Sequence, residues 1–177
     1  MASPVRYLAV VALLLSIPGA PPARAKEESD DPLSVKVAAV TLPAGGSAEA
    51  IVTIVLASGY AILADPAPTP WTTGASLAVV STGGVVAKTA LFPAPQKVRD
   101  ADGGKEVGRW TGTFEVRVPL EAAAKAAPGD RRLHGRLRYQ LHVEESYYKV
   151  ATRDIEIPVK VVKAKKGSGG AAPATRP

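Results

Sequence analysis

The 177-residue chain contains no cysteine, one methionine and two histidines. Without cysteine it can form neither a disulfide nor a thiolate, which excludes thiol redox chemistry and thiolate metal sites. The single methionine is Met1, so a copper site built from Cys and Met ligands is also excluded. His134 and His142 are eight positions apart, and on one strand they would lie roughly 27 Å apart, too far to share a metal ion. The fold must therefore rest on a hydrophobic core alone.

Long apolar runs are equally scarce, and the longest lies near the N-terminus. Arg6 precedes the 11-residue apolar run Tyr7–Ile17, and Ala23 and Ala25 then occupy the small-residue positions of a signal-peptidase site. A membrane-spanning helix needs about 20 apolar residues, so this run is too short to be an uncleaved anchor. We expect residues 1–25 to be a signal peptide cleaved after Ala25. The mature chain is then periplasmic or secreted and has no transmembrane segment.

The positive charge of the chain is concentrated at its ends. The whole sequence has a net charge of +6, whereas residues 26–159 contain 15 Lys and Arg against 16 Asp and Glu, a net of −1. A balanced domain is not typical of nucleic-acid-binding proteins, so we expect no nucleic-acid partner. We expect the charged segment 26–32 to be flexible and the basic Gly/Ala/Pro-rich tail 163–177 to be disordered. The folded domain is then 33–162.

The most frequent pattern in the sequence is an alternation of apolar and polar residues with a period of two. Apolar side chains at every second position are typical of half-buried antiparallel strands. The clearest alternation runs through 110–120, 133–143 and 154–161, and shorter strand-like runs are 33–40, 49–56, 76–81 and 85–92. Seven to nine short strands at this spacing predict an all-β fold, a single-domain immunoglobulin-like antiparallel β-sandwich.

Individual residues refine this prediction. Trp110 should open the inward face of its strand, and Tyr139 should belong to the core. Pro158 cannot donate a ladder hydrogen bond, so its strand should lie at a sheet edge there. The pair Gly83-Gly84 should form the turn between two strands. Leu120–Ala127 is the one helical candidate, since Glu and Lys stand four residues apart and Pro-Gly follows.

Five segments resemble the N-terminal domain of DsbD-type thiol:disulfide interchange proteins, the disulfide bond corrector domain. They keep the order of the family's blocks across most of 33–162. The most specific part runs from Pro128-Gly129 through Tyr139-Gln140. The segments are GYAILADPAPTPWTTGASLAV (59–79), ALFPAPQKV (90–98), WTGTFEVRVPL (110–120), APGDRRLHGRLRYQ (127–140) and IEIPVKVV (155–162).

The chain departs from this family at the redox site. The resemblance implies one cysteine two residues after Tyr139-Gln140 and a second five residues later, and these positions hold His142 and Tyr147. Imidazole and phenol cannot take part in disulfide exchange, which requires a thiolate. The corner between the last two strands therefore resembles a redox site without its redox atoms.

Other chemistries find little support in the same corner. His142 with Glu144 or Glu145 offers two metal ligands, which do not hold a metal selectively, so a solvated polar corner is the simpler interpretation. No nucleophile-elbow motif surrounds a serine, and adjacent strand carboxylates point to opposite faces. We therefore expect neither a cofactor, nor a metal, nor an enzymatic activity.

The tyrosines leave binding as the leading hypothesis. Tyr147 and Tyr148 follow the strand corner, and aromatic residues with a polar group are favoured at protein interfaces. Trp71 is a further aromatic candidate. We expect a non-catalytic binding or adaptor module that contacts another exported protein through His142, Glu144, Tyr147 and Tyr148. The alternatives are a component of a periplasmic disulfide-reduction pathway that docks a thioredoxin-like partner, and a structural domain of the cell envelope.

Overall fold

The computed structural model describes residues 31–99, 106–144 and 146–164, and every regular element among them is a β-strand. Because these residues contain no helix, none of them forms a helix that could cross a membrane. The strands are β1 (Leu33–Val37), β2 (Val40–Pro43), β3 (Ser47–Leu56), β4 (Tyr60–Leu63), β5 (Ser76–Val79), β6 (Val85–Ala87), β7 (Gln96–Arg99), β8 (Glu106–Thr111), β9 (Thr113–Ala122), β10 (Gly129–Val143) and β11 (Ser146–Val162).

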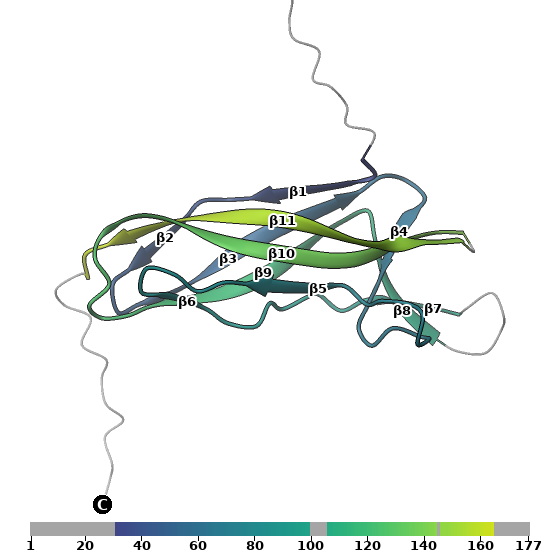
Figure 1. The fold of residues 1–177 in the computed structure, drawn as a ribbon, viewed down its shortest axis with the longest axis horizontal. Helices are drawn as coiled ribbons and strands as arrows, with labels where there is room; N and C mark the ends of the chain where they lie inside the picture. The colour runs from purple at the N-terminus through teal and green to yellow at the C-terminus, as the bar shows by residue number, and fades with distance from the viewer. Residues whose placement is uncertain (1–30, 100–105, 145, 165–177) are drawn as a thin grey trace, which may run out of the picture. The chain divides into compact units, whose positions relative to one another are not determined.

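The strands form two sheets that share one core (Figure 1). One sheet has the order β1-β3-β9-β6; the other has the order β2-β11-β10-β4-β8-β7, with β5 also paired to β10. The described pairs are antiparallel except that of β2 with β11, which is parallel. The predicted immunoglobulin-like β-sandwich is confirmed, with this one parallel pair as an addition.

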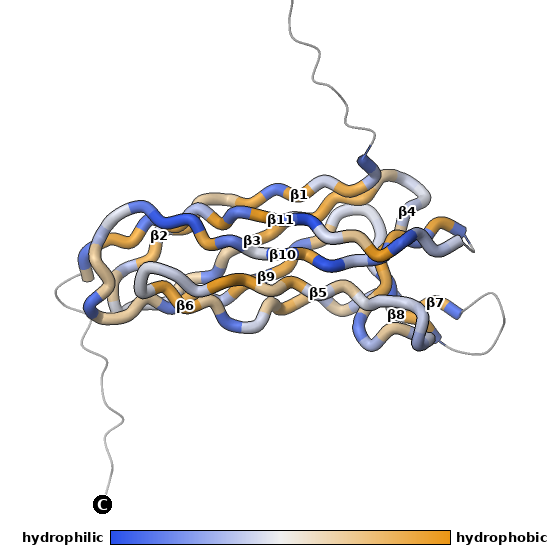
Figure 2. Tube along the Cα trace, viewed as in Figure 1, coloured by the Kyte–Doolittle hydropathy of each residue, from blue (hydrophilic) through white to orange (hydrophobic). Residues whose placement is uncertain are grey.

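The core contains alternate residues of the facing strands. Val116 and Leu120 of β9, Leu133 and Leu137 of β10, and Ile157 of β11 are completely buried, as the alternation predicted. Figure 2 shows the resulting change between apolar and polar residues along the strands. Strand β3 lies between β1 and β9 in its sheet, which agrees with the apolar residues on both faces of 49–56.

The segment 110–120 alternates without a break, but the prediction of one strand is wrong. Strand β8 ends at Thr111 and pairs with β4, whereas β9 begins at Thr113 and pairs with β3 in the other sheet. Gly112 between them has a φ of 62°, a conformation that glycine adopts without a steric penalty. The segment 33–40 is divided between the sheets in the same way, as β1 and β2. The alternation of apolar and polar residues indicates which face of a strand is buried. It does not indicate which of the two sheets the strand joins.

The predicted helix over Leu120–Ala127 is also wrong. Leu120 and Ala122 are buried residues of β9, and Leu120 pairs with Ala48 of β3. The chain turns only afterwards, where the Ala126 amide donates to the Ala123 carbonyl at 2.9 Å. A two-turn helix is marginal by itself, so the sheet hydrogen bonds and the buried side chains outweigh its local preference.

Two further predictions concern turns and edges. Gly83 and Gly84 have φ values of 59° and 78°, so they do form a turn, but β5 and β6 on either side belong to different sheets. Pro158 agrees with its predicted position, because the pairing of β11 with β2 starts only at Val159. Its other neighbour is Arg132 of β10.

The terminal predictions fall mostly on residues that the structure does not describe. The expected signal peptide, 1–25, lies outside the described residues, as do 26–30 and 165–177. Asp31 is described: its carboxylate accepts a hydrogen bond from the Leu33 amide at 3.0 Å and pairs with Arg153 of β11. This contact links the segment before β1 to the second sheet.

Candidate functional site

The candidate residues gather where β10 turns into β11, at the end that also holds β4 and β8 (Figure 1). Val143 pairs with Ser146, so two residues form the turn, and His142 directly faces Tyr147. Glu144 has a φ of 50°, which is uncommon for a residue with a side chain and costs roughly 1–2 kcal/mol. Two-residue hairpin turns favour positive φ and therefore usually contain Gly or Asn.

A row of residues crosses four strands at this point. Thr111 of β8 pairs with Ala61 of β4, Ala61 pairs with His142, and His142 pairs with Tyr147. Residues directly opposite one another share a face of the sheet. The neighbouring residue of β4, Ile62, is completely buried in the core. The row therefore lies on the opposite face, which points away from the core.

Two aromatic pairs mark the corner. The rings of His142 and Tyr147 lie 4.7 Å apart between centroids at an angle of 43°, and those of Tyr60 and Tyr148 lie 6.1 Å apart at 48°. Hydrogen bonding with the Tyr148 phenol raises the pKa of Tyr60 above its usual value. Tyr147 is 39% exposed and Tyr148 48%. Tyr60 pairs with Val143, so it lies on the other face of the sheet from His142 and Tyr147. We call Tyr60, His142, Tyr147 and Tyr148, which border this end of the sheet on its two faces, the aromatic corner.

A buried amide holds the backbone beside the aromatic corner. Between Gln140 and His142 the register of β10 against β11 shifts, so that Tyr148 and Lys149 oppose Leu141. The Gln140 side chain donates through Nε2 to the Tyr148 carbonyl at 2.9 Å and accepts through Oε1 from the Thr73 amide at 2.7 Å. Gln140 thus ties the irregular part of β11 to the loop between β4 and β5.

The alternation through 133–143 predicts that Gln140 lies on the exposed polar face of its strand, and this prediction is wrong, since only 6% of the residue is exposed. The alternation itself holds, because Arg138 on the same face is exposed and donates to the Thr73 hydroxyl at 3.3 Å. Gln140 is buried because the loop between β4 and β5 packs against it. No local pattern marks such a contact, which joins residues 67 positions apart.

The other aromatic candidates divide between core and surface. Tyr139 is 4% exposed, so its assignment to the core is confirmed. Trp71 is 78% exposed, on the loop between β4 and β5. Glu145 lies outside the described residues. Tyr60 was not singled out, although its position after Gly59, at the start of a strand, is typical of a turn boundary.

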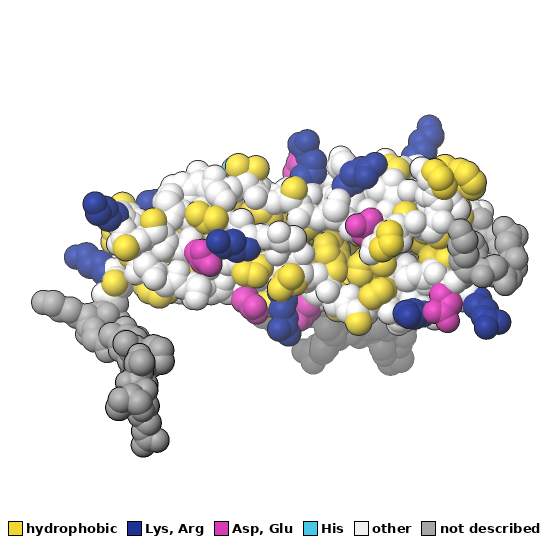
Figure 3. Space-filling model, turned by 90° about the horizontal axis from the view of Figure 1, so that it is seen from below, with side chains coloured by type: hydrophobic (Ala, Val, Ile, Leu, Met, Phe, Trp, Pro, Cys, Tyr) yellow, Lys and Arg dark blue, Asp and Glu magenta, His cyan; other side chains and the backbone are white. Residues whose placement is uncertain are grey.

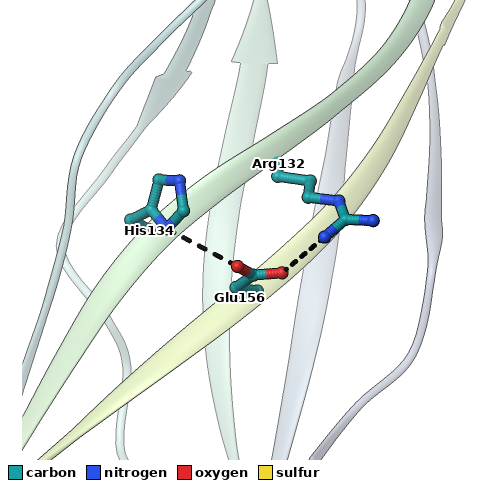
Figure 4. Close-up of polar contacts among 3 residues, drawn as sticks. All are labelled: Arg132, His134 and Glu156. Carbon is teal, nitrogen blue, oxygen red and sulfur yellow. Dashed lines mark hydrogen bonds and ion pairs between the residues drawn. The ribbon is translucent and has the colours of Figure 1, made fainter.

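The second histidine belongs to a solvated ladder farther along the same two strands. His134 faces Glu156, with 4.0 Å between Nδ1 and Oε1, and Arg132 contacts the same carboxylate at 3.1 Å (Figure 4). Next to them Arg136 donates to Asp154 at 2.8 Å and lowers the pKa of that carboxyl. These side chains are more than half exposed, so each pair contributes little to stability.

Charge and metal ligands do not single out another site. In the described part of the chain, no three His, Asp or Glu side chains lie close enough together to hold a metal ion. On the face drawn in Figure 3, basic and acidic side chains are interspersed. Exposed ion pairs occur among the described residues, such as Lys88 with Glu121 at 2.9 Å.

The register of β10 against β11 allows a test of whether His142 and Tyr147 match the family's two cysteine positions. Directly paired antiparallel residues have Cα atoms about 4.5–5.5 Å apart, within the about 4.4–6.8 Å that a disulfide requires. Because His142 and Tyr147 are such a pair, the double variant His142→Cys/Tyr147→Cys should form an intramolecular disulfide in air while staying folded. Intact mass and thiol titration before and after reduction measure the bond.

The matched control is Val143→Cys/Tyr147→Cys. Val143 pairs with Ser146, so its side chain points to the other face of the sheet from Tyr147 and a bridge would need backbone movement. Equal oxidation of the two variants would mean that the hairpin end has no defined register. A folded test variant that stays reduced would contradict the match to the cysteine positions.

Comparison with known proteins finds a likeness of fold. No family model matches the chain, and no curated protein matches it. Among solved structures, the N-terminal periplasmic domain of ScsB from Proteus mirabilis aligns with a TM-score of 0.50 and 13% identity, over 73% of this chain. The seventh ScaB type I cohesin of Pseudobacteroides cellulosolvens aligns with a TM-score of 0.40 and 10% identity, over 79% of this chain and 97% of that one.

The alignment covers 47% of the ScsB structure, so this chain spans about half of its length. At 13% identity the likeness shows a distant relationship of fold. Membership of the DsbD-type family stays a hypothesis that rests on the five sequence segments.

Proposed function

We propose that this protein is an exported, non-catalytic module that binds another exported protein through the aromatic corner. The observation that carries the proposal is the exposure of Tyr147 and Tyr148, 39% and 48%, at consecutive positions near the start of β11. Both rings contact a second ring, so little conformational entropy is lost when a partner covers them. Aromatic side chains held in this way are typical of the anchor residues of interfaces.

Two features of the backbone support the same place. The bonds of Gln140 to Tyr148 and Thr73 hold the corner before any partner arrives. The turn residue Glu144 keeps an unfavourable φ where Gly or Asn would relax it. Strained residues occur preferentially at functional sites, so this conformation favours a role for the turn in recognition.

The proposed location rests on the sequence and on the fold. The N-terminal segment has the charge, the apolar run and the small residues of a secretory signal. The structure with the TM-score of 0.50 is described as a periplasmic domain. The absence of cysteine from the whole chain supports a role without its own redox chemistry.

As a second candidate function, the protein is a component of a disulfide-reduction pathway that docks a thioredoxin-like partner. In this case the partner supplies both thiols. The observation that favours it is the direct pairing of His142 with Tyr147, the two positions that match the family's cysteines. Affinity capture separates the two candidates, because the second requires the captured protein to contain a reactive dithiol.

The test is capture from periplasmic extract with the tagged chain as bait. The variant Tyr147→Ser/Tyr148→Ser removes the anchor rings at exposed positions and should reduce the amount of bound protein at least about tenfold, since anchor residues contribute about 2 kcal/mol or more each. Quantitative mass spectrometry measures each bound protein.

Val86→Ser is the control, since Val86 is an exposed apolar residue, 44% accessible, on β6 of the other sheet. It should leave capture unchanged. If the double tyrosine variant retains every protein that the wild type binds, the aromatic corner is not the docking surface.

A further inference from the structure

A groove of about 510 Å³ lies between β1 of one sheet and β11 of the other (Figure 1). Val35 and Val37 of β1 line one side of it, and residues 153–156 and Pro158 of β11 line the other. Strand β11 pairs with β2 only from Val159 onward. Before that point, among the described residues, its one strand partner is β10. We call this place, where the second sheet lacks a strand beside β11, the edge groove.

The backbone of β11 presents hydrogen-bonding groups to the edge groove. The Val162 carbonyl accepts from the Ala44 amide at 2.9 Å, so it points toward β2 and away from β10. Backbone groups of successive strand residues point alternately to the two sides, and the register from 150 to 161 is regular. The N–H and C=O groups of Asp154 and Glu156 therefore point to the same side as Val162, ahead of the start of β2. Pro158 belongs to this series, so its missing N–H costs no bond to β10.

The valines of β1 show that the core is incompletely covered at the edge groove. Val35 pairs with Ile54 of β3, and Val37 pairs with Val52, so each pair shares one face of the sheet. Ile54 and Val52 are 0% and 1% exposed, whereas the two valines are only partly buried. The edge groove thus combines an open backbone edge with two core-facing valines that solvent still reaches.

The charged side chains around the edge groove already have partners of opposite charge. The pairs are Arg132 with Glu156 at 3.1 Å, Arg136 with Asp154 at 2.8 Å, and Arg153 with Asp31. A charged occupant would meet no uncompensated charge among these groups and would lose its hydration. Charge complementarity therefore favours an uncharged occupant.

We propose that the edge groove binds an uncharged, extended segment of another protein, which pairs with β11 as an added strand. An open edge binds an extended backbone through main-chain hydrogen bonds, and alternate side chains of the added strand supply specificity. From Arg153 to Pro158 the edge spans about 17 Å at about 3.4 Å per residue, enough for a strand of about five residues. Alternate apolar side chains of that strand would cover Val35 and Val37. This second docking surface does not depend on the aromatic corner.

Amide hydrogen exchange of the full chain, followed by NMR, tests the edge directly. In the free protein the amides of Asp154 and Glu156 should exchange rapidly, whereas those of Arg153 and Ile155, which face β10, should exchange slowly. The probe is the blocked peptide Ac-Thr-Val-Thr-Val-Thr-NH2, which should protect the Asp154 and Glu156 amides saturably. The control peptide has the same side chains with its backbone amides N-methylated, and it should give no protection because it lacks donors.

Two variants at one position separate the backbone from the side chain. Asp154→Pro removes the N–H that points into the edge groove, and proline is tolerated at an open edge, as at Pro158. It should weaken peptide binding at least about tenfold, because a hydrogen bond is lost and the ring obstructs the added strand. Asp154→Ala loses the ion pair with Arg136, keeps the N–H and should bind as the wild type does. If Asp154→Pro does not fold, Val35→Thr replaces it, and the added hydroxyl should also weaken binding.

Four results would overturn the inference. They are Asp154 and Glu156 amides that are already protected in the free chain, no protection by the peptide, equal protection by the N-methylated control, and equal affinities of Asp154→Pro and Asp154→Ala. In the first case another part of this chain or a second copy occupies the edge, and sedimentation at two protein concentrations shows which. Tyr147→Ser/Tyr148→Ser should bind the peptide as the wild type does. Loss of binding in that variant would place the peptide at the aromatic corner and contradict a separate surface.

Discussion

Replacing Trp110 with alanine is expected to lower the free energy of unfolding by about 3–5 kcal/mol, the usual cost of truncating a buried aromatic residue. Trp110 is 6% exposed and lies between Phe92 and Phe114, with ring centroids 5.1 and 5.5 Å away. Its indole also donates to the Pro93 carbonyl at 3.0 Å. The variant therefore leaves a cavity between two rings and a carbonyl without its donor. Since domains of this size have a total stability of about 5–15 kcal/mol, much of the variant population should be unfolded.

Urea denaturation followed by circular dichroism measures the effect, and the other tryptophan supplies the control. Trp71→Ala removes the same side chain from a position that is 78% exposed, so its effect should stay within about 0.5 kcal/mol. Trp110→Phe should fall between the two, because it keeps an aromatic ring and loses the bond to Pro93. Similar stabilities of Trp110→Ala and Trp71→Ala would place Trp110 at the surface and contradict the division between β8 and β9.

Replacing Gln140 with alanine should cost about 1–3 kcal/mol, because two partly buried backbone groups lose hydrogen bonds that contribute about 0.5–1.5 kcal/mol each. The groups are the Thr73 amide and the Tyr148 carbonyl, bonded at 2.7 and 2.9 Å. The loss has a local consequence as well, since the loop between β4 and β5 and the irregular part of β11 are no longer joined. Hydrogen exchange should accelerate at the Thr73 amide and leave the amides of β3 protected.

Arg138→Ala is the matched control for Gln140. Arg138 lies on the same face of β10 and donates to the Thr73 hydroxyl, but it is exposed, so its loss should change stability by about 0.5 kcal/mol or less. Unchanged exchange of the Thr73 amide in Gln140→Ala would mean that the loop is held by other contacts. The corner would then owe its order to the β10 and β11 ladder alone.

Some residues of the candidate site could be identified from the sequence, and others are added to it only by the tertiary structure. His142, Tyr147 and Tyr148 could be chosen from sequence because they follow a strand that alternates clearly and flank a predicted corner. Tyr60 and the burial of Gln140 could not, because each depends on a strand or loop far away along the chain. Tyr60 comes through the pairing of β4 with β10, and Gln140 is covered through a contact with residue 73.

By itself, the amino-acid sequence determined the all-β class, the inward residues of the long strands and the absence of thiol chemistry. Each of these follows from residue type and from a period of two, which are local properties. Only the tertiary structure decided that 110–120 divides at Gly112, that 120–127 stays a strand and a turn, and that β2 runs parallel to β11. It also decided that a polar residue, Gln140, is buried. The physical reason is that the alternation of apolar and polar residues shows only which face of a strand is buried. Which sheet the strand joins, whether it pairs in parallel or antiparallel, and whether a loop covers its outer face depend on contacts between distant segments.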